Sequence, residues 1–471
     1  MFYTYIVMGC GQAVRHGILT PAFLGSNPST PAILMKEKIY LDLNIKNFPS
    51  NTISMEDFFK YKNVSKEELE RIKNRVILHC DVNNFYASAE CACNPELEGK
   101  PVAVSGNPKT RTGIILAKNA IAKSYGVQTG EAIFQAKQKC PELVCLPPNF
   151  ELYQELSNKI IDIYYDYTDT VESFGIDECW LDVTASLKLF GSGEKIANEI
   201  RRRVLKEIGV TISVGVSFTK LFAKLGSDLK KPFATTVISK NEFEKIIYPL
   251  PVNSVIGIGK RSQQKLEKMN ILTLGDFINL PDSELKTLFG VNGLILKQKL
   301  LGKDIDEVLD NSLKPEVKSV GNGTTTITDI TSREEIFSLI QFLSEKISKR
   351  LINKNICGRT VDVSIKTSTF QYYKKAETFF SPVFLPEDIA NSAMKIIDEF
   401  WTYESPIRSI RISVKNIESI SSPKQISLFE TNNLKTEKLN RAIEKLRDKH
   451  GKNIIQLGSI SKSKFINKEN E

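Results

Sequence analysis

The chain has 471 residues, too many for a single hydrophobic core, and this length predicts about three or four domains. Hydrophobic residues make up 41% of the chain and charged residues 25%, which are the proportions of a globular protein and exclude a fibrous or wholly disordered one. The 64 Lys and Arg residues exceed the 55 Asp and Glu residues, so the net charge of +9 favours a polyanionic partner without identifying it.

Cysteine usage and hydropathy indicate the compartment. The eight cysteines include no Cys-x-x-Cys pair, and the chain has only 3 histidines, so we expect reduced thiols rather than a zinc site. No uninterrupted apolar run is long enough to cross a bilayer, and the first residues lack the basic segment of a secretory signal. We therefore expect a cytoplasmic protein with no membrane partner.

Two N-terminal segments stand apart from the rest. Residues 1–34 have scattered Gly, Pro and Ser without helical or strand periodicity, and back-translation of two short parts resembles the arms of a transfer RNA gene. One hypothesis is that 1–34 is not genuine coding sequence and that translation starts at Met35 or later; the alternative is a disordered tail. Residues 56–74 predict a short charged helix opened by a capping box of Ser65 and Glu68, with no indicated role.

Two predicted strands carry carboxylates next to apolar residues. Asp81 follows the strand that begins at Val76, and Asp177 and Glu178 stand side by side in a later strand. A buried carboxylate is costly unless it is paired or binds a cation, and Mg²⁺ prefers such hard oxygen ligands. Spacing alone leaves the alternative open, because neighbouring acids on strands are more often solvated or helix-capping groups.

From residue 246 the pattern changes to short helices and glycine turns. Residues 255–280 and, more weakly, 281–304 have the pattern of helix-hairpin-helix units. Gly257 and Gly259 would let backbone amides approach a DNA phosphate. The alternative is an ordinary glycine turn in a helical subdomain.

Residues 318–416 predict a sheet backed by helices at 331–352 and 386–402. Two strands alternate with period two, so one face is apolar and the other polar. The apolar face is expected to carry Val361, Val363, Ile365, Ile410, Ile412 and Val414, and the polar face Thr360, Asp362, Ser364, Lys366, Arg411, Ser413 and Lys415. The polar face suits a nucleic-acid backbone, with Lys366, Arg411 and Lys415 as DNA contacts. The alternative is a solvated face, since residues 316–420 contain 14 basic and 13 acidic residues.

Four motifs together identify a family. In chain order they are DVNNFYASAE, AKNAIAKSYGVQTGEAI, GIDECWLDVT and TISVGVSFTKLFAKLGSDLKKPFATTVI. Their order and spacing resemble those of Y-family DNA polymerases, in the bacterial DNA polymerase IV or UmuC-type branch, over roughly residues 75–430.

The resemblance implies roles for the acids and the aromatic pair. Asp81, Asp177 and Glu178, with the Val82 carbonyl, would bind two Mg²⁺ ions for transfer of a nucleotide from a dNTP to a primer 3′-hydroxyl. Phe85 and Tyr86 would contact the nucleotide. Tyr86 is the expected steric gate, because a ring beneath the sugar leaves no room for a 2′-hydroxyl. For both aromatic residues, core packing is the alternative.

The resemblance also implies that Lys231 contacts the triphosphate. Many relatives carry Tyr and Arg where this chain has Ala120 and Lys123, so Lys123 keeps a charge but not the bidentate geometry of an arginine. Gly175 replaces a frequent Ser before the Asp-Glu pair.

A short motif in the tail predicts a partner. The sequence KQISLFE at 424–430 resembles the peptide by which bacterial polymerases bind the sliding clamp. Its anchors would be Gln425, Ile426, Leu428 and Phe429.

The expected fold class is α+β and multidomain, arranged as a right-hand polymerase. The predicted domains are an N-terminal extension at 1–74, a palm at 75–84 and 153–245, fingers at 85–152, a helix-hairpin-helix thumb at 246–310, a little finger at 318–416 and a tail at 417–471. The predicted function is error-prone translesion DNA synthesis on primer-template DNA by a monomer without proofreading. A metal-dependent nuclease and a catalytically silent module that binds clamp and DNA are the alternatives.

Overall fold

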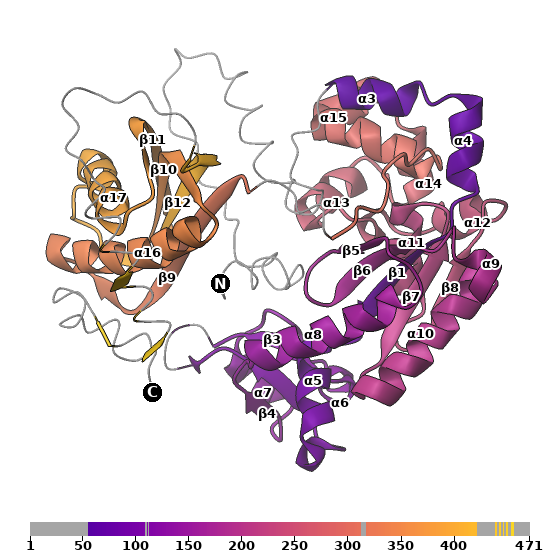
Figure 1. Ribbon diagram of the computed structural model, residues 1–471, viewed down its shortest axis with the longest axis horizontal. Coiled ribbons are helices and arrows are strands. Elements are labelled where there is room, and N and C mark those ends of the chain that lie inside the picture. The colour runs from indigo at the N-terminus through magenta and orange to yellow at the C-terminus, as the bar shows by residue number, and fades with distance from the viewer. Residues whose placement is uncertain are drawn as a thin grey trace. The chain divides into compact units, whose positions relative to one another are not determined.

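The computed structural model describes residues 55–108, 111, 113–311 and 317–421, with isolated positions between 439 and 455 (Figure 1). These residues fall into two compact units, one formed by 55–106 and 114–311 and the other containing 317–421. Residues 1–54 and the tail motif at 424–430 lie outside the described residues, so the hypotheses about them stay predictions. Within the described part of the chain, no helix is both long and apolar enough to span a bilayer.

A five-stranded sheet forms the centre of the first unit, in the order β5-β6-β1-β7-β8. Its strands are β1 (Ile77–Val82), β5 (Val171–Ser173), β6 (Glu178–Asp182), β7 (Ile212–Ser217) and β8 (Thr235–Ile238). Only the β7-β8 pair is parallel among these neighbours. Strands β1 and β7 are buried along their whole length.

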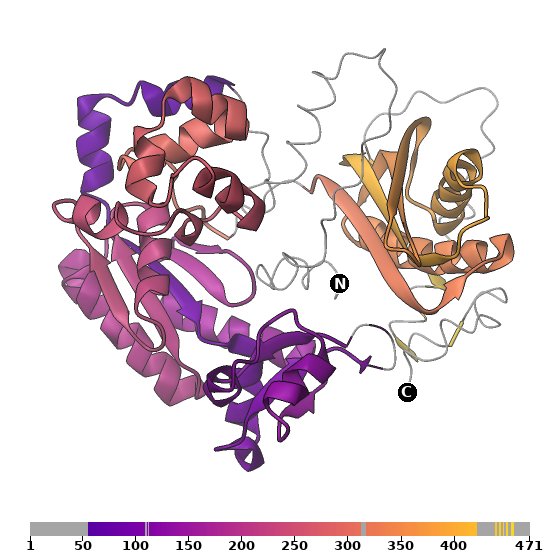
Figure 2. The same ribbon diagram turned by 180° about the vertical axis from the view of Figure 1, so that it is seen from behind.

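Helices cover both faces of this sheet, which explains why its central strands are buried. Helix α10 (Gly193–Ile208) packs beside α8 (Phe150–Tyr165), and α11 (Lys220–Leu229) packs on β1, β7 and β8 (Figures 1 and 2). A methyl group on Gly215 would lie 1.8 Å from the Ala223 carbonyl oxygen of α11. The helix can therefore approach the strand closely only because residue 215 has no side chain.

A smaller three-stranded sheet in the order β3-β2-β4 lies at one end of the first unit (Figure 1). Its elements are α5 (Phe85–Cys93), β2 (Val102–Ser105), β3 (Ile115–Lys118), α6 (Ala120–Ser124), α7 (Ile133–Lys139) and β4 (Val144–Leu146). Helix α5 starts directly after β1 and contacts β2, β3 and α8, so it connects the two sheets.

Short helices follow the central sheet, as the glycine-rich pattern predicts. They are α12 (Phe243–Ile247), α13 (Lys260–Glu267) and α14 (Leu274–Asn279), followed by the longer α15 (Asp282–Leu300). A further short helix, α9 (Leu187–Phe190), lies earlier in the chain, between β6 and α10. Helix α15 is interrupted at Gly290, where φ is +63°. The weaker of the two predicted units is thus two helical parts joined at a glycine.

The N-terminal segment forms two helices, α3 (Met55–Lys62) and α4 (Lys66–Lys73), where the sequence predicts one. The predicted cap is present, because Ser65 Oγ accepts a hydrogen bond from the Glu68 amide at 3.1 Å. Phe58, Tyr61 and Ile72 are buried in the core that also holds the helices after β8. The segment for which the sequence indicates no role is therefore integrated in the fold.

A buried polar cluster fastens these N-terminal helices to the end of α15. Tyr61 donates a hydrogen bond to the Asp306 carboxylate, and Lys299 forms ion pairs with Asp306 and, at 3.3 Å, with Asp304. The Arg75 guanidinium donates to the carbonyl oxygens of Asp304 and Asp306, at 2.6 and 2.9 Å. The cluster joins two chain segments, 61–75 and 299–306, that are distant in sequence.

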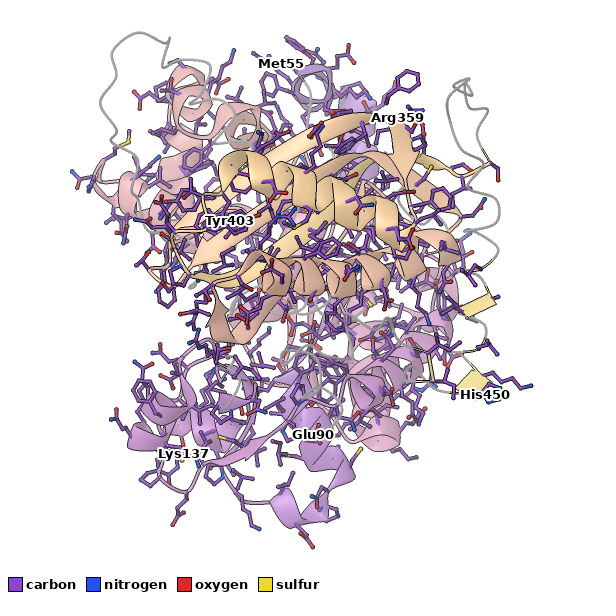
Figure 3. The ribbon with its side chains drawn as sticks, turned by 90° about the vertical axis from the view of Figure 1, so that its left-hand side faces the viewer. Met55, Glu90, Lys137, Arg359, Tyr403 and His450 are labelled. Atoms are coloured by element: carbon purple, nitrogen blue, oxygen red, sulfur yellow. The ribbon has the colours of Figure 1, made fainter. Side chains whose placement is uncertain are left out.

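The second unit is a four-stranded antiparallel sheet, in the order β11-β10-β12-β9, covered on one face by two helices (Figure 3). Its elements are β9 (Ser319–Ile330), α16 (Arg333–Asn353), β10 (Ile356–Thr367), β11 (Tyr372–Val383), α17 (Pro386–Phe400) and β12 (Ile407–Ser419). The side chains predicted on the apolar face are buried under these helices.

Replacing Lys299 with Met should destabilise the first unit by about 3–5 kcal/mol, because Asp304, with 0% of its surface exposed, would keep a buried charge without its cation. Lys297→Met is the matched control on the same helix. Its pair with Asp282 is partly exposed, so the loss should be about 1 kcal/mol or less. Urea unfolding measures both, and equal losses would contradict the account of the cluster.

Candidate active site

Strand pairing brings the predicted acids to one end of the central sheet. In the antiparallel register of β1 and β6, Asp81 lies opposite Glu178. The amide of Val82, the last residue of β1, donates to the Asp177 carbonyl oxygen at 3.0 Å. Asp81, Asp177 and Glu178 are therefore neighbours, although more than ninety residues of chain separate the first from the other two.

The three carboxylates perturb one another. Burial and then the Glu178 charge raise the pKa of Asp81 to about 6, against the opposing effects of Lys231 and Lys224. Burial and then the charges of Glu178 and Asp81 raise the pKa of Asp177 well above its usual range. Such a group of acids is stabilised by added positive charge.

Lysines of α11 and of the turn after it supply part of that charge. Lys224 Nζ lies 2.6 Å from Glu178 Oε2, and Lys231 Nζ lies 2.7 Å from Asp81 Oδ2 and 2.9 Å from Asp228 Oδ1. The sequence motif indicates Lys231 but not Lys224. The signal for Lys224 is its spacing, four residues after Lys220, which places the two side chains on one face of α11.

The donor set fits a hard divalent cation, because it consists of carboxylate oxygens that repel one another. Among the residues that the structure describes, no three His, Cys, Asp or Glu side chains are grouped as a ready-made metal site. Glu178 and Asp81 are engaged by Lys224 and Lys231 instead. Metal binding at these acids therefore requires their side chains to exchange partners.

His79 is a functional-site neighbour that the sequence analysis does not identify. It lies two residues before Asp81 on the same face of β1, with its Nδ1 2.9 Å from Ser227 Oγ and its Nε2 3.5 Å from Glu178 Oε2. Burial and then the Lys224 charge lower its pKa well below the usual value. The imidazole is therefore neutral and fully enclosed beside the acids.

The aromatic pair lies at the start of α5, directly after β1. The Tyr86 ring stacks on Tyr153 with a centroid distance of 4.5 Å and contacts Phe150 edge-on. Tyr153 donates a hydrogen bond to Glu90 Oε1 at 2.6 Å. Phe85 and Tyr86 are 3% and 5% exposed, so packing fixes both rings.

The structure accounts for one departure from the family pattern. Gly175, which stands before the Asp-Glu pair, has a φ of +106°, a conformation that favours glycine over serine. Ala120 begins α6, and Lys123 is exposed on the same short helix. Burial and then the charge of Lys123 lower the pKa of Lys118. These two cations therefore lie near each other, one on the smaller sheet and one on its helix.

The predicted DNA-contact glycines lie before α13. Gly257 has a φ of +103°, which requires glycine. Gly259 is the N-cap of α13, has an ordinary φ of −88° and faces open space at its missing Cβ.

On the second unit, part of the positive charge of the predicted polar face is already paired with an acid. Asp362 and Lys415 lie on adjacent strands and form an ion pair at 2.8 Å. The Lys415 ammonium is therefore paired with an acid of the same face. Lys366 lies 4.5 Å from the Phe370 ring centroid, whereas Arg411 is exposed. The four clamp-motif anchors lie outside the described residues.

Comparison with known proteins gives matches along most of the chain. Family models match at residues 80–228 (impB/mucB/samB family), 240–271 (IMS family HHH motif) and 317–428 (impB/mucB/samB family C-terminal domain). A DNA polymerase IV of Acetivibrio thermocellus is 42% identical over 396 residues, which cover 84% of this chain and 99% of that protein. DNA polymerase IV 1 of Bacillus subtilis is 36% identical over 83% of this chain and 94% of that protein.

Solved structures agree with these matches. A Y-family DNA polymerase chimera superposes with a TM-score of 0.65 at 25% identity, covering 73% of this chain and 99% of the chimera. The insertion ternary complex of Dbh DNA polymerase, at 23% identity and a TM-score of 0.54, shows the same fold. The carboxylates, the helix-hairpin-helix segment and the full-length relatives together show that the chain belongs to the impB/mucB/samB family, the Y family of DNA polymerases, and is a DNA-directed DNA polymerase.

Proposed function

We propose that this polymerase performs error-prone, template-directed synthesis past lesions, adding a dNTP to a primer 3′-hydroxyl with two Mg²⁺ ions and without proofreading. The observation that carries the proposal is the convergence of Asp81, Asp177 and Glu178 at the paired ends of β1 and β6. Relatives named DNA polymerase IV support it.

In this proposal the acids bind the metal ions and the lysines bind the triphosphate. Asp81, Asp177 and Glu178, with the Val82 carbonyl, would hold the metal ions, which when bound promote ionisation of the primer hydroxyl and neutralise the triphosphate. Lys231 and Lys123 would bind phosphate oxygens as point charges and align the α-phosphorus with the primer 3′-oxygen. In-line attack by that oxygen forms the new phosphodiester bond and releases pyrophosphate.

Sugar selection would be performed by Tyr86, supported by Phe85. The ring of Tyr86 is held by its stack on Tyr153, so it cannot swing away from a 2′-hydroxyl without breaking core contacts. A rigid ring excludes the larger sugar by shape.

Binding of primer-template DNA would use several surfaces and no base readout. The amides around Gly257 and Gly259 would bind backbone phosphates, and Lys366, Arg411 and Lys415 would contact the duplex from the second unit. Lys415 would have to exchange Asp362 for a phosphate. Gln425, Ile426, Leu428 and Phe429 would attach the tail to the sliding clamp.

The domain boundaries are part of this proposal. Residues 75–84 with 153–245 would form the palm, 85–152 the fingers, 246–310 the thumb and 318–416 the little finger. We propose that the protein acts as a cytoplasmic monomer and that small fingers leave the nascent base pair loosely enclosed, so that distorted bases are accepted.

Substitution of Asp177 or Glu178 by Ala should reduce primer extension by at least about 10³-fold, because each variant loses an oxygen ligand for the metal ions. Asp182→Asn is the matched control at the opposite end of β6, where its Oδ1 accepts from the Thr184 amide. It should retain extension activity. Extension by the Ala variants at the wild-type rate would refute the assignment.

Tyr86→Ala should admit ribonucleotides, raising kcat/KM for a ribonucleotide relative to its deoxy counterpart by at least about tenfold. Tyr86→Phe keeps the ring and its stack on Tyr153, so it should keep sugar discrimination. Single-nucleotide insertion kinetics compare the two, and unchanged discrimination in Tyr86→Ala would exclude the gate.

Binding of Mn²⁺ to the wild-type protein should weaken about fivefold between pH 6 and pH 5, because metal must displace a proton from Asp81 once the pH falls below its pKa of about 6. Calorimetry measures the affinity, and circular dichroism at each pH verifies that the protein stays folded. A constant affinity from pH 7 to pH 5 would show that Asp81 is not a ligand.

A further inference from the structure

Helix α11 and the turn after it hold a row of cations above the acids of the central sheet. Lys220 Nζ lies 2.5 Å from Glu172 Oε2, and Lys224 Nζ lies 2.6 Å from Glu178 Oε2. Only the second pair involves a proposed metal ligand. The side chains of Lys220 and Lys224 are 9% and 13% exposed, so both pairs are largely screened from water.

Full ionisation of the acids would leave excess negative charge even with their lysines. Asp81, Asp177, Glu178 and Asp228 contribute −4 when ionised, and Lys224 and Lys231 contribute +2, which leaves −2. The lysines thus reduce the repulsion among the acids of the metal-free cluster without cancelling their full negative charge. A divalent cation at Glu178 would lie close to the Lys224 ammonium, and two cations at such short range in a largely buried site repel strongly.

We propose that Lys224 is a positioning residue that holds the Glu178 carboxylate until a divalent cation displaces its ammonium group. The inference rests on the proposed metal site at Glu178 and adds a step to it, since metal and lysine compete for the same carboxylate. Lys224 thereby stabilises the metal-free enzyme and weakens its metal affinity.

The surrounding residues offer the displaced ammonium a new partner. Ser227 Oγ donates to the Lys224 carbonyl oxygen at 2.8 Å, so its lone pairs are available to accept from His79 Nδ1 at 2.9 Å. That arrangement leaves His79 Nε2 without a proton, and this buried atom has no hydrogen-bond partner among the described residues. Nε2 lies 3.5 Å from Glu178 Oε2, the same oxygen that Lys224 contacts, so it is an acceptor beside the carboxylate that the ammonium group would leave.

The test compares Lys224→Met with Lys220→Met, each of which keeps the aliphatic stem and loses the charge. Electron paramagnetic resonance of free Mn²⁺ gives the metal affinity, and thermal unfolding in EDTA gives the metal-free stability. We expect Lys224→Met to bind Mn²⁺ about five- to tenfold more tightly, because a competing charge is gone, and to unfold at a lower temperature in EDTA. Lys220→Met should also unfold at a lower temperature but bind Mn²⁺ like the wild-type protein.

The outcomes separate this inference from the function on which it rests. Unchanged or weaker Mn²⁺ binding by Lys224→Met would overturn the competition, and Lys224→Gln repeats the measurement if the Met variant does not fold. Equal tightening in Lys220→Met would also overturn it, because the effect would then be a general one of lost positive charge. If the wild-type protein binds no Mn²⁺, or if Glu178→Gln binds Mn²⁺ as well as the wild-type protein does, the proposed metal site itself is wrong.

Discussion

The antiparallel pairing of β1 with β6 is the constraint on which the rest of the site depends. It sets Asp81 opposite Glu178 and draws Asp177 to the amide of Val82, so three acids share one partly buried end of the sheet. Gathering like charges out of water is unfavourable, and the raised pKa values of Asp81 and Asp177 reflect this. The fold has to supply positive charge to the same place.

That charge comes from α11, and the sheet determines where the helix lies. The close contact at Gly215 seats α11 on β7, and the helical repeat then points lysines at successive acids. These ion pairs between lysines and acids are present in the protein without substrate. In the proposed mechanism, metal and triphosphate would rearrange the same lysines that pair with these acids in the absence of substrate.

Local sequence patterns predicted the parts of this site that have a strong local signal. The strand before Asp81 and the two helices behind the second sheet follow from hydrophobic periodicity. Lys224 and His79 were not found, because a lysine on an amphipathic helix is ordinarily solvated and a histidine in a buried strand is ordinarily core. Their partners come from other strands and helices, which no local pattern contains. The pairing of Lys415 with Asp362 was missed for the same reason, since it joins neighbouring strands.

The absence of a side chain at residue 215 determines where α11 lies on the central sheet. A single methyl group there would collide with the backbone of α11 at 1.8 Å, where real carbon contacts are never shorter than about 3.0 Å, so the helix would have to tilt or lift. Every ammonium group carried by that helix would move with it as one rigid body. Charge balance at the proposed metal site thus depends on residue 215 carrying only a hydrogen atom.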